Sequence, residues 1–462
     1  MDNITLKDLL LATEGRLIFY KDINQQISNV SVDTRTLKEG DLFFALKGNN
    51  FDGHNFISDA IKKKCSGIVV SKLSSSILSE FYSDLPAVIF TFDTLEALGK
   101  LAQYYIEKLS PTVIGITGSN GKTTTKEIIY SIFSSVYPAL ANPGNYNNLI
   151  GIPLSIFNLK AEHKFCILEL GISFKKEMDK LIKITNPSVG IITNIGKTHL
   201  EFLLTEENVF EEKKKLIDHA QVGIINIDNK YLNRLNYNNK TIITFSTENK
   251  YADIFADNIQ ISEELLEFEL ISLKYNIKTK IKSFISGKYN IYNILAAIAV
   301  SLYFKIDIEI IKQTLLNFKL PKMRMERIVL PTGTTIFNDS YNANPDSMIT
   351  AIGDFMKLNN QKRKILVLGD MCELGDSSKV QHIELGKFIN NFLITKVYLF
   401  GENIKYTMET LKNAKYFNNI DELVDDLKNE LKPDTEILFK ASRKICLERI
   451  IQKLCYITSS IH

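Results

Sequence analysis

Short apolar runs alternate with helix-like stretches along most of this 462-residue chain. In its middle part the runs read TVIGIT, FCILELG, VGIITNIG and VGIINID, and such runs between helices predict a parallel sheet. The later runs KILVLGDM, KVYLFG and EILFKAS repeat the pattern. We therefore expect an α/β protein of three domains: a small N-terminal α/β domain (1–105), a central domain with a mostly parallel sheet (106–320) and a smaller C-terminal α/β domain (321–462).

The composition is typical of a globular protein that acts on small molecules. A formal net charge of +3 gives no electrostatic reason to bind nucleic acid or an anionic membrane. The five cysteines are scattered without a CxxC pair, which disfavours a disulfide framework and a thiolate zinc site. No apolar run approaches the ~18 residues of a membrane span, and the first residues lack the features of a signal peptide. We expect a cytoplasmic protein without stable membrane insertion and, in the absence of a coiled-coil seam, a monomer.

A glycine loop follows the first apolar run of the central segment, in the stretch GITGSNGKTTTKE. Strand, glycine loop and helix is the arrangement of a phosphate site: glycines let backbone N–H groups approach phosphate oxygens, a lysine adds charge and a threonine hydroxyl reaches Mg²⁺. The spacing departs from the strict P-loop at Ile116, and a glycine turn before an amphipathic helix is the alternative. ATP binding is the favoured interpretation, with these candidate residues: Gly118, Ser119, Asn120, Gly121, Lys122, Thr123 and Thr124.

Polar residues close the apolar runs of the central segment. FCILELG contains Glu169, VGIITNIG contains Asn194 and is followed by His199, and VGIINID contains Asn226 and Asp228. In open parallel sheets, ligands bind outside the carboxyl ends of the strands. Each residue alone could be a capping or core polar group, but together, beside a phosphate loop, a carboxylate and an imidazole suggest Mg²⁺ ligands.

One lysine lies on the apolar side of a predicted helix. In TEENVFEEKKKLIDHA, Thr205 is placed to cap the helix, and Lys213 falls four residues from both Val209 and Ile217 of the apolar stripe. A lysine on a buried face is costly. Snorkelling or an ion pair is the usual explanation, and a catalytic or modified lysine is the other.

At this point the chain resembles the Mur ligase family, the ATP-dependent amide-bond ligases of cell-wall precursor synthesis. The family loop TGxNGKT corresponds to 117–123, NPGNYNNLIGIP at 142–153 resembles NxGNxNNxxGxP, and GKYNIYNILAA at 287–297 matches the adenine signature. The resemblance implies a P-loop ATPase central domain and a Rossmann-like C-terminal domain. It also implies that Asn290 and Asn293 contact adenine.

The same resemblance implies a two-metal site. A strand-end glutamate and a histidine bind Mg²⁺ in this family, matching Glu169 and His199, and a helical lysine beyond the histidine, matching Lys213, is carbamylated. Thr123 would be a further ligand, and two Mg²⁺ ions are expected with ATP. Lys122, Lys213, His199 and Glu169 are then the candidate catalytic residues.

The last segment resembles the branch of the family that adds D-alanyl-D-alanine, through NDSYNANPDSM (338–348) and LGDMCELG (368–375). Arg324 and Asp339 would reach ATP from the C-terminal domain, although Asp339 alone could be a turn residue and Asn342 and Asn344 could be structural Asx turns. The stretch 32–54 resembles the domain that holds the UDP sugar. The candidate substrate-binding residues are Ser31, Thr34, Arg35, Asn145, Asn147, Asn148, Asn342 and Asn344.

Three positions depart from the family pattern. Met323 and Ala441 stand where the family usually has glycine, and ISFKKEM follows ELG where an asparagine-glycine pattern is usual. None of the three removes a candidate ligand.

The resemblance implies a reaction in which the terminal carboxylate of UDP-N-acetylmuramoyl-tripeptide attacks the γ-phosphate of ATP. The acyl phosphate so formed would be attacked by the amine of D-alanyl-D-alanine. Two alternatives stay open: a sibling ligase of the Mur or folylpolyglutamate type with another amine, and a nucleotide-binding module without ligase chemistry.

Overall fold

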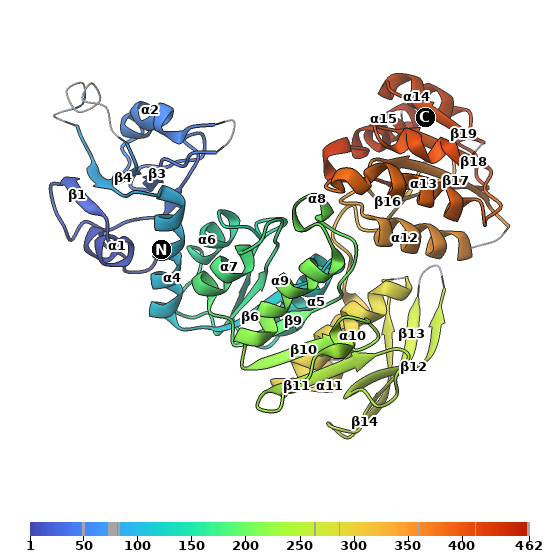
Figure 1. Ribbon diagram of the computed structural model, residues 1–462, viewed down its shortest axis with the longest axis horizontal. Helices are drawn as coiled ribbons and strands as arrows, with labels where there is room; N and C mark the ends of the chain where they lie inside the picture. Colours follow the sequence, from blue (N-terminus) through green and yellow to red (C-terminus); the bar gives the residue numbers. More distant parts are fainter. Residues whose placement is uncertain are drawn as a thin grey trace.

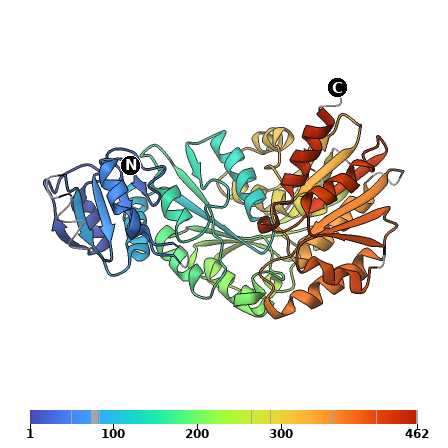
Figure 2. The ribbon, with the colours of Figure 1, turned by 90° about the horizontal axis from the view of Figure 1, so that it is seen from above.

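The computed structural model describes residues 1–48, 51–72, 81, 84–262, 265–285, 287–358, 361–411 and 413–459. The chain forms three sheets, each with its own helices, and the predicted mixed α/β fold with three domains and mostly parallel sheets is confirmed. Figures 1 and 2 show the N-terminal and C-terminal domains at opposite ends of the molecule, with the central domain between them.

The N-terminal sheet has the order β1-β5-β4-β3-β2, in which only β1 runs antiparallel to its neighbour. Its strands are β1 (Arg16–Phe19), β2 (Val30–Ser31), β3 (Leu42–Phe44), β4 (Gly67–Val70) and β5 (Ala87–Phe90). Its helices are α1 (Leu6–Thr13), η1 (Gly53–Phe56) and α2 (Ile57–Lys62). Helix α4 (Thr94–Leu109), capped by the Asp93 carboxylate, then leads into the central domain.

The central sheet has the order β14-β13-β12-β11-β10-β9-β6-β8-β7. Its parallel part comprises β6 (Thr112–Thr117), β7 (Ala139–Ala141), β8 (Phe165–Glu169), β9 (Val189–Ile192), β10 (Val222–Asn226), β11 (Thr241–Ser246) and β12 (Ile254–Ile261). An antiparallel extension, which the sequence did not indicate, adds β13 (Leu266–Ser272) and β14 (Ile277–Ser283).

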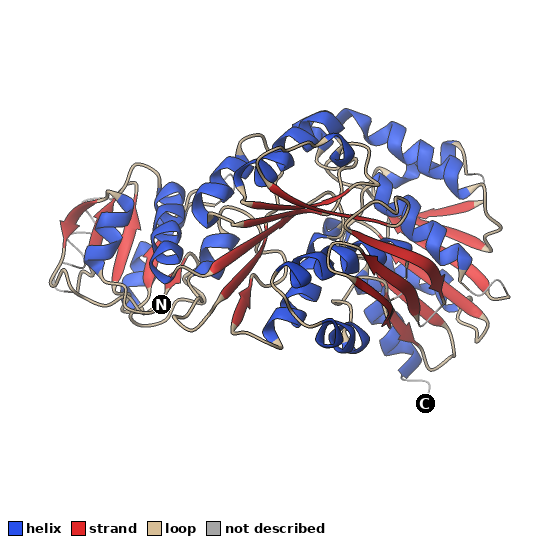
Figure 3. Cartoon of the chain, turned by 90° about the horizontal axis from the view of Figure 1, so that it is seen from below, coloured by secondary structure: helices blue, strands red, loops and turns tan. Residues whose placement is uncertain are grey.

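Helices lie on both sides of the central strands (Figure 3). They are α5 (Lys122–Ser134), α6 (Gly151–Ile156), α7 (Glu177–Thr185), α8 (Leu200–Leu203), α9 (Glu206–His219), η2 (Leu232–Arg234), α10 (Lys288–Tyr303) and α11 (Ile308–Asn317). The apolar strands are buried throughout because helices cover both faces, as the continuous apolar runs predicted.

The C-terminal sheet has the order β15-β16-β20-β17-β18-β19, with β15 antiparallel at its edge. The strands are β15 (Glu326–Val329), β16 (Thr335–Asp339), β17 (Arg363–Gly369), β18 (Lys396–Phe400), β19 (Ala414–Phe417) and β20 (Thr435–Lys440). The helices are α12 (Pro345–Lys357), η3 (Gly375–Ser377), α13 (Ser378–Ile389), η4 (Ile404–Glu409), α14 (Ile420–Lys428), η5 (Arg443–Ile445) and α15 (Glu448–Ser459).

The three domains are not joined in the same way. One hydrophobic cluster runs from the N-terminal domain through α4 into α6, α7 and α9 of the central domain, so these two domains share a continuous core. The two clusters of the C-terminal domain are built from its own residues, and Leu200 of α8 is a central-domain side chain that packs against one of them. Polar contacts across a cavity make up much of the remaining junction, which is described below. Such a junction permits relative domain movement more readily than a shared core does.

Candidate active site

The glycine loop has the conformation that a phosphate site requires. It connects the end of β6 at Thr117 to the start of α5 at Lys122. Gly121 adopts a φ of +79°, and a Cβ on it would lie 2.2 Å from Asn293 Oδ1, so a side chain is excluded twice over. The Asn120 N–H donates to Asn194 Oδ1 (2.9 Å), and Lys122 Nζ donates to the Gly118 carbonyl (2.8 Å). The loop is thus fixed by its neighbours before any phosphate arrives.

The loop opens into a cavity of about 850 Å³ between the central and C-terminal domains. The carboxyl ends of strands from both sheets contribute to it. Nineteen of the predicted residues line this cavity: Ser119, Asn120, Gly121, Lys122, Thr123, Thr124, Asn145, Asn147, Asn148, Glu169, Asn194, His199, Asn226, Asp228, Asn290, Asn293, Arg324, Asp339 and Asn342. Six predicted residues do not: Gly118, Lys213, Asn344, Ser31, Thr34 and Arg35. The structure therefore brings together most of the predicted nucleotide and metal residues.

Glu169 ends β8 with one carboxylate oxygen used and one free. Asn147 Nδ2 donates to Oε1 (2.7 Å), and the buried Oε2 has no hydrogen-bond partner among the described residues. The main chain of Glu169 is held as well, because its N–H donates to Asn142 Oδ1 (2.8 Å). Lys126 is fully buried and donates to the Asn142 carbonyl (2.5 Å), which anchors this arrangement to α5. An oriented carboxylate with an unused buried oxygen suits a cation.

Lys213 is buried on α9, as the periodicity predicted. Its side chain is 0% exposed, and Nζ has no hydrogen-bond partner among the described residues. Burial, and then the charge of Lys122, lowers the pKa of Lys213 well below its ordinary value, while Glu169 and Glu212 act in the opposite direction. Snorkelling does not explain the residue, because the amine does not reach solvent. An ion pair does not either, since no carboxylate bonds the amine.

The two lysines that follow Lys213 on α9 differ from it because each has a carboxylate partner. The side chains of Lys214 and Lys215 are 29% and 32% exposed and form ion pairs with Asp218 and with Asp179 and Glu212. They are half-buried because α7 packs alongside α9.

His199 lies at the start of α8, with a φ of 54° that non-glycine residues rarely adopt. Its Nδ1 lies 2.5 Å from Glu373 Oε2, which belongs to the C-terminal domain. Burial lowers the pKa of His199, opposed by the hydrogen bond to Glu373, and that bond lowers the pKa of Glu373. The other ring nitrogen, Nε2, remains for a ligand.

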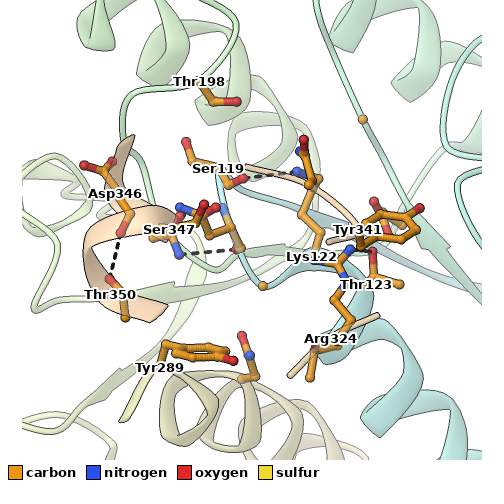
Figure 4. A pocket seen from close by; sticks show the side chains of 18 of the residues that line it. Ser119, Lys122, Thr123, Thr198, Tyr289, Arg324, Tyr341, Asp346, Ser347 and Thr350 are labelled. Carbon is orange, nitrogen blue, oxygen red and sulfur yellow. Dashed lines mark hydrogen bonds between the residues drawn. The ribbon is translucent and has the colours of Figure 1, made fainter. Parts of the chain in front are cut away.

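Arg324 and Asp339 bring the C-terminal side of the cavity to the phosphate loop. Arg324 donates from its NH2 group to Thr123 Oγ1 (3.0 Å) and stacks 4.1 Å above the Tyr341 ring, and Figure 4 shows this pair beside Lys122. Asp339 pairs with Lys440 (2.6 Å). The Met323 residue before Arg324 has a φ of 60°, which explains why a glycine suits that position.

The predicted asparagines fall into two groups. Asn290 and Asn293 are buried and joined to each other (3.0 Å) at the start of α10, where they line the cavity. The second group, Asn145, Asn147 and Asn148, also lines the cavity, and within it Asn147 donates to Glu169 and Asn148 accepts from the Gly151 N–H (2.8 Å). Asn147 and Asn148 therefore shape the site from within the protein.

Asn344 takes a structural capping role, whereas Asn342 does not form an Asx turn. Asn342 Oδ1 accepts from the Ala343 N–H (2.9 Å), and its side chain still lines the cavity. Asn344 caps α12 in a capping box with Ser347. Its amide also donates to Asn120 Oδ1 (2.8 Å), so it connects the C-terminal domain to the phosphate loop.

The three N-terminal candidates lie away from the cavity. The Ser31 hydroxyl donates to the Asp33 carbonyl (2.9 Å), Thr34 is buried, and Arg35 is an exposed side chain paired with Asp33 (2.6 Å). They are near one another in sequence and space but are not part of the central site.

Several cavity residues were not predicted. Glu373, Asp346, Tyr289 and Lys440 all line it. Asp346 Oδ2 accepts from the Lys197 N–H (2.9 Å), and a Cβ on Gly196 would lie 2.1 Å from the same oxygen. These contacts join residues far apart in the chain, so no local pattern predicts the pairing. Glu373, Asp346 and Tyr289 lie within the quoted motifs LGDMCELG, NDSYNANPDSM and GKYNIYNILAA without having been singled out, and Lys440 is the lysine that ends an apolar run.

The donor set fits a metal that keeps few protein ligands. Within the described part of the chain, no three His, Cys, Asp or Glu side chains cluster closely enough to hold an ion by themselves. Glu169 Oε2 and the Thr123 hydroxyl are hard oxygen donors that suit Mg²⁺ completed by phosphate oxygens and water, and His199 Nε2 adds a softer nitrogen donor.

The described residues also include no helix long and apolar enough to cross a membrane.

The fold and this two-domain cavity define a class, and the chain belongs to the Mur ligase family. It matches the Mur ligase family catalytic domain over 26–105, the middle domain over 116–301 and the glutamate ligase domain over 323–443. These ranges lie inside the three predicted domains.

Relatives at about 30% identity over nearly the whole chain include ligases of one name. The chain is 34% identical to a UDP-N-acetylmuramoyl-tripeptide–D-alanyl-D-alanine ligase of Bacillus subtilis, which spans 97% of this chain and 98% of the relative. It is 29% identical to the ligase of the same name from Escherichia coli, over 98% and 99% of the two chains.

Solved structures agree. MurF from Acinetobacter baumannii superposes with a TM-score of 0.89 at 30% identity over 98% of each chain. MurF ligase from Thermotoga maritima in complex with ADP gives 0.84 at 27% identity, over 94% of this chain and 98% of the other.

Proposed function

We propose that this chain is an ATP-dependent ligase that joins D-alanyl-D-alanine to UDP-N-acetylmuramoyl-tripeptide in peptidoglycan precursor synthesis. The observation that carries the proposal is the single cavity in which a phosphate loop, the free oxygen of Glu169 and Arg324 of another domain converge. The full-length similarity to ligases of this name supports the choice of substrates. A cytoplasmic location and a monomeric state stay predictions.

The residues divide into three tasks. The backbone of Gly118–Gly121 with Lys122, Thr124 and Arg324 holds the ATP phosphates, and Asn290 and Asn293 receive the adenine. Thr123, Glu169, His199 and a carbamylated Lys213 would hold two Mg²⁺ ions, which when bound would neutralise the charge of the phosphate oxygens and orient them. Asn145 and Asn342 face the substrates, and Ser31, Thr34 and Arg35 contact the UDP end.

In the first step a carboxylate oxygen of the tripeptide attacks the γ-phosphorus, and ADP leaves. Lys122 and Arg324 offset the charge gathered at the transferring phosphoryl group. In the second step the amine of D-alanyl-D-alanine attacks the acyl carbon, and phosphate is expelled from the tetrahedral intermediate. The C-terminal domain covers the cavity, which keeps water from the acyl phosphate.

Phosphate release is the test of this function. Release from ATP and Mg²⁺ is expected only when UDP-N-acetylmuramoyl-tripeptide and D-alanyl-D-alanine are both present, with a product heavier by the dipeptide less one water. Release with another amine in place of D-alanyl-D-alanine would show that the chain is a sibling ligase of the same family. ATP binding without release under any pairing would instead support the nucleotide-binding module.

Asn147→Ala is expected to raise the Mg²⁺ concentration needed for half-maximal activity about 10- to 100-fold, because Glu169 loses the donor that orients it. The measurement is a Mg²⁺ titration of phosphate release at fixed substrates. Asn158→Ala removes an exposed asparagine that only donates to the Leu154 carbonyl, so it serves as the control. An unchanged Mg²⁺ requirement in Asn147→Ala would contradict this role.

A further inference from the structure

The loop that carries His199 is held by the C-terminal domain at three points. The Glu201 N–H donates to the Glu373 carbonyl (3.1 Å), and Leu200 packs against the apolar cluster of the C-terminal domain. Gly375, with a φ of +51°, faces Glu201 so closely that a Cβ would lie 3.0 Å from its Cα. Helix α8 therefore docks on the segment 371–377, next to η3.

A further contact is the side-chain bond between His199 Nδ1 and Glu373 Oε2. A carboxylate on Nδ1 fixes the tautomer, because Nδ1 then carries the proton and Nε2 presents its lone pair. It also fixes the ring plane. His199 sits in a left-handed backbone conformation, so the ring direction depends on what surrounds it rather than on a regular helix.

We propose that Glu373 is a positioning residue for His199, supplied by the C-terminal domain so that the imidazole is oriented for a metal ion only when that domain is docked. The inference rests on the metal role proposed for His199 above. The domain organisation supports it, since the N-terminal and central domains share a core whereas the C-terminal domain meets the central domain through contacts such as these. Docking of the domain thereby completes the metal site.

An ordinary interdomain ion pair is the competing explanation. In that case the pair between His199 and Glu373 would only stabilise the docked position of the C-terminal domain. It would have no separate effect on the affinity of the site for a metal ion. The two explanations differ in where the cost of removing the carboxylate falls, in metal affinity or in docking alone.

The test is Mn²⁺ binding to the full chain with ATP, followed by electron paramagnetic resonance, in the absence of the acceptor peptide. Glu373→Ala is expected to weaken Mn²⁺ binding about 10- to 100-fold, in the range usual for loss of an outer-shell partner. Glu373→Gln is expected to recover part of the affinity, because its amide oxygen still accepts from Nδ1. Binding of ATP measured without any metal should not change.

Two further variants test whether docking of the domain and orientation of the ring are linked. Leu200→Ala, which removes the apolar contact without touching the ring, is expected to weaken Mn²⁺ binding too, and its effect should not add to that of Glu373→Ala. Glu384→Ala removes an exposed carboxylate on α13 that pairs only with Lys387, so it is the matched control and should bind Mn²⁺ like the parent.

Unchanged Mn²⁺ affinity in Glu373→Ala, while the parent chain binds Mn²⁺ and ATP, would overturn the positioning role and leave the proposed ligase intact. Equal losses in metal-free ATP binding and in Mn²⁺ binding would favour the simple ion pair. A parent chain that binds ATP but no Mn²⁺ would instead count against the metal site on which the inference rests.

Discussion

Replacing Lys213 with alanine is expected to lower ligase turnover at least ~100-fold, comparable with the removal of other preorganised groups in active sites. The buried amine has no hydrogen-bond partner in the described part of the chain, and its pKa is lowered by burial. A neutral amine is what carbamylation requires, and the product is an anion able to bind a cation beside Glu169. The measurement is phosphate release with both substrates present.

Bicarbonate distinguishes the carbamate from other uses of Lys213. In Lys213→Ala the lost side chain leaves room for a small anion, so high bicarbonate is expected to restore part of the activity. Labelled bicarbonate should give a carbamate ¹³C signal in the parent chain and none in the variant. Lys214→Ala is the control, because Lys214 follows in sequence but is a half-exposed partner of Asp218. Full activity of Lys213→Ala without bicarbonate would rule out the carbamate.

Lys213→Met separates this loss of activity from loss of the fold. Methionine keeps the apolar stem and removes a buried amine that nothing satisfies, so it should not lower the melting temperature of the protein in bicarbonate-free buffer. Turnover should fall as in Lys213→Ala. A variant that is both inactive and unfolded would show that the amine serves stability instead.

The site residues that could be predicted are those whose positions follow from the periodicity or spacing of residues close to them in the sequence. The 3.6-residue period placed Lys213 among Val209, Leu216 and Ile217, all of which are buried. The apolar runs placed Glu169 at a strand end, and the glycine spacing placed Lys122 at the first turn of α5. In each case the local backbone alone determines where the side chain points.

The contacts across the domain junction were not predictable in this way. His199 and Glu373 are 174 residues apart, and Asn120 and Asn344 are 224 apart. Such pairs depend on how one domain is placed on another, which no periodicity encodes. The same reason explains Asn147: its motif marked it for the substrate, and only the fold shows its amide on Glu169.

Replacing Lys122 with alanine is expected to have the second large effect on turnover. The loss of transition-state stabilisation should be about 3 kcal/mol or more. Lys122 stands at the first position of α5, where its amine meets the carbonyl of Gly118 and shares its surroundings with Glu169 and Arg324. In the proposed reaction this charge would lie beside the transferring phosphoryl group, so its removal is expected to affect turnover most.

Lys122→Met keeps the stem and removes only the charge, and it should lose nearly as much turnover as Lys122→Ala. Lys160→Ala provides the control, because Lys160 is half-exposed and pairs with Asp2 far from the cavity. The measurement is turnover together with ATP affinity in all three variants. A loss of ATP affinity with unchanged turnover would mean that Lys122 stabilises bound ATP but not the transition state. If neither turnover nor ATP affinity changed, the assignment of this loop as the phosphate site would be wrong. A drop in turnover that exceeds the drop in affinity is what a group reserved for the transition state produces.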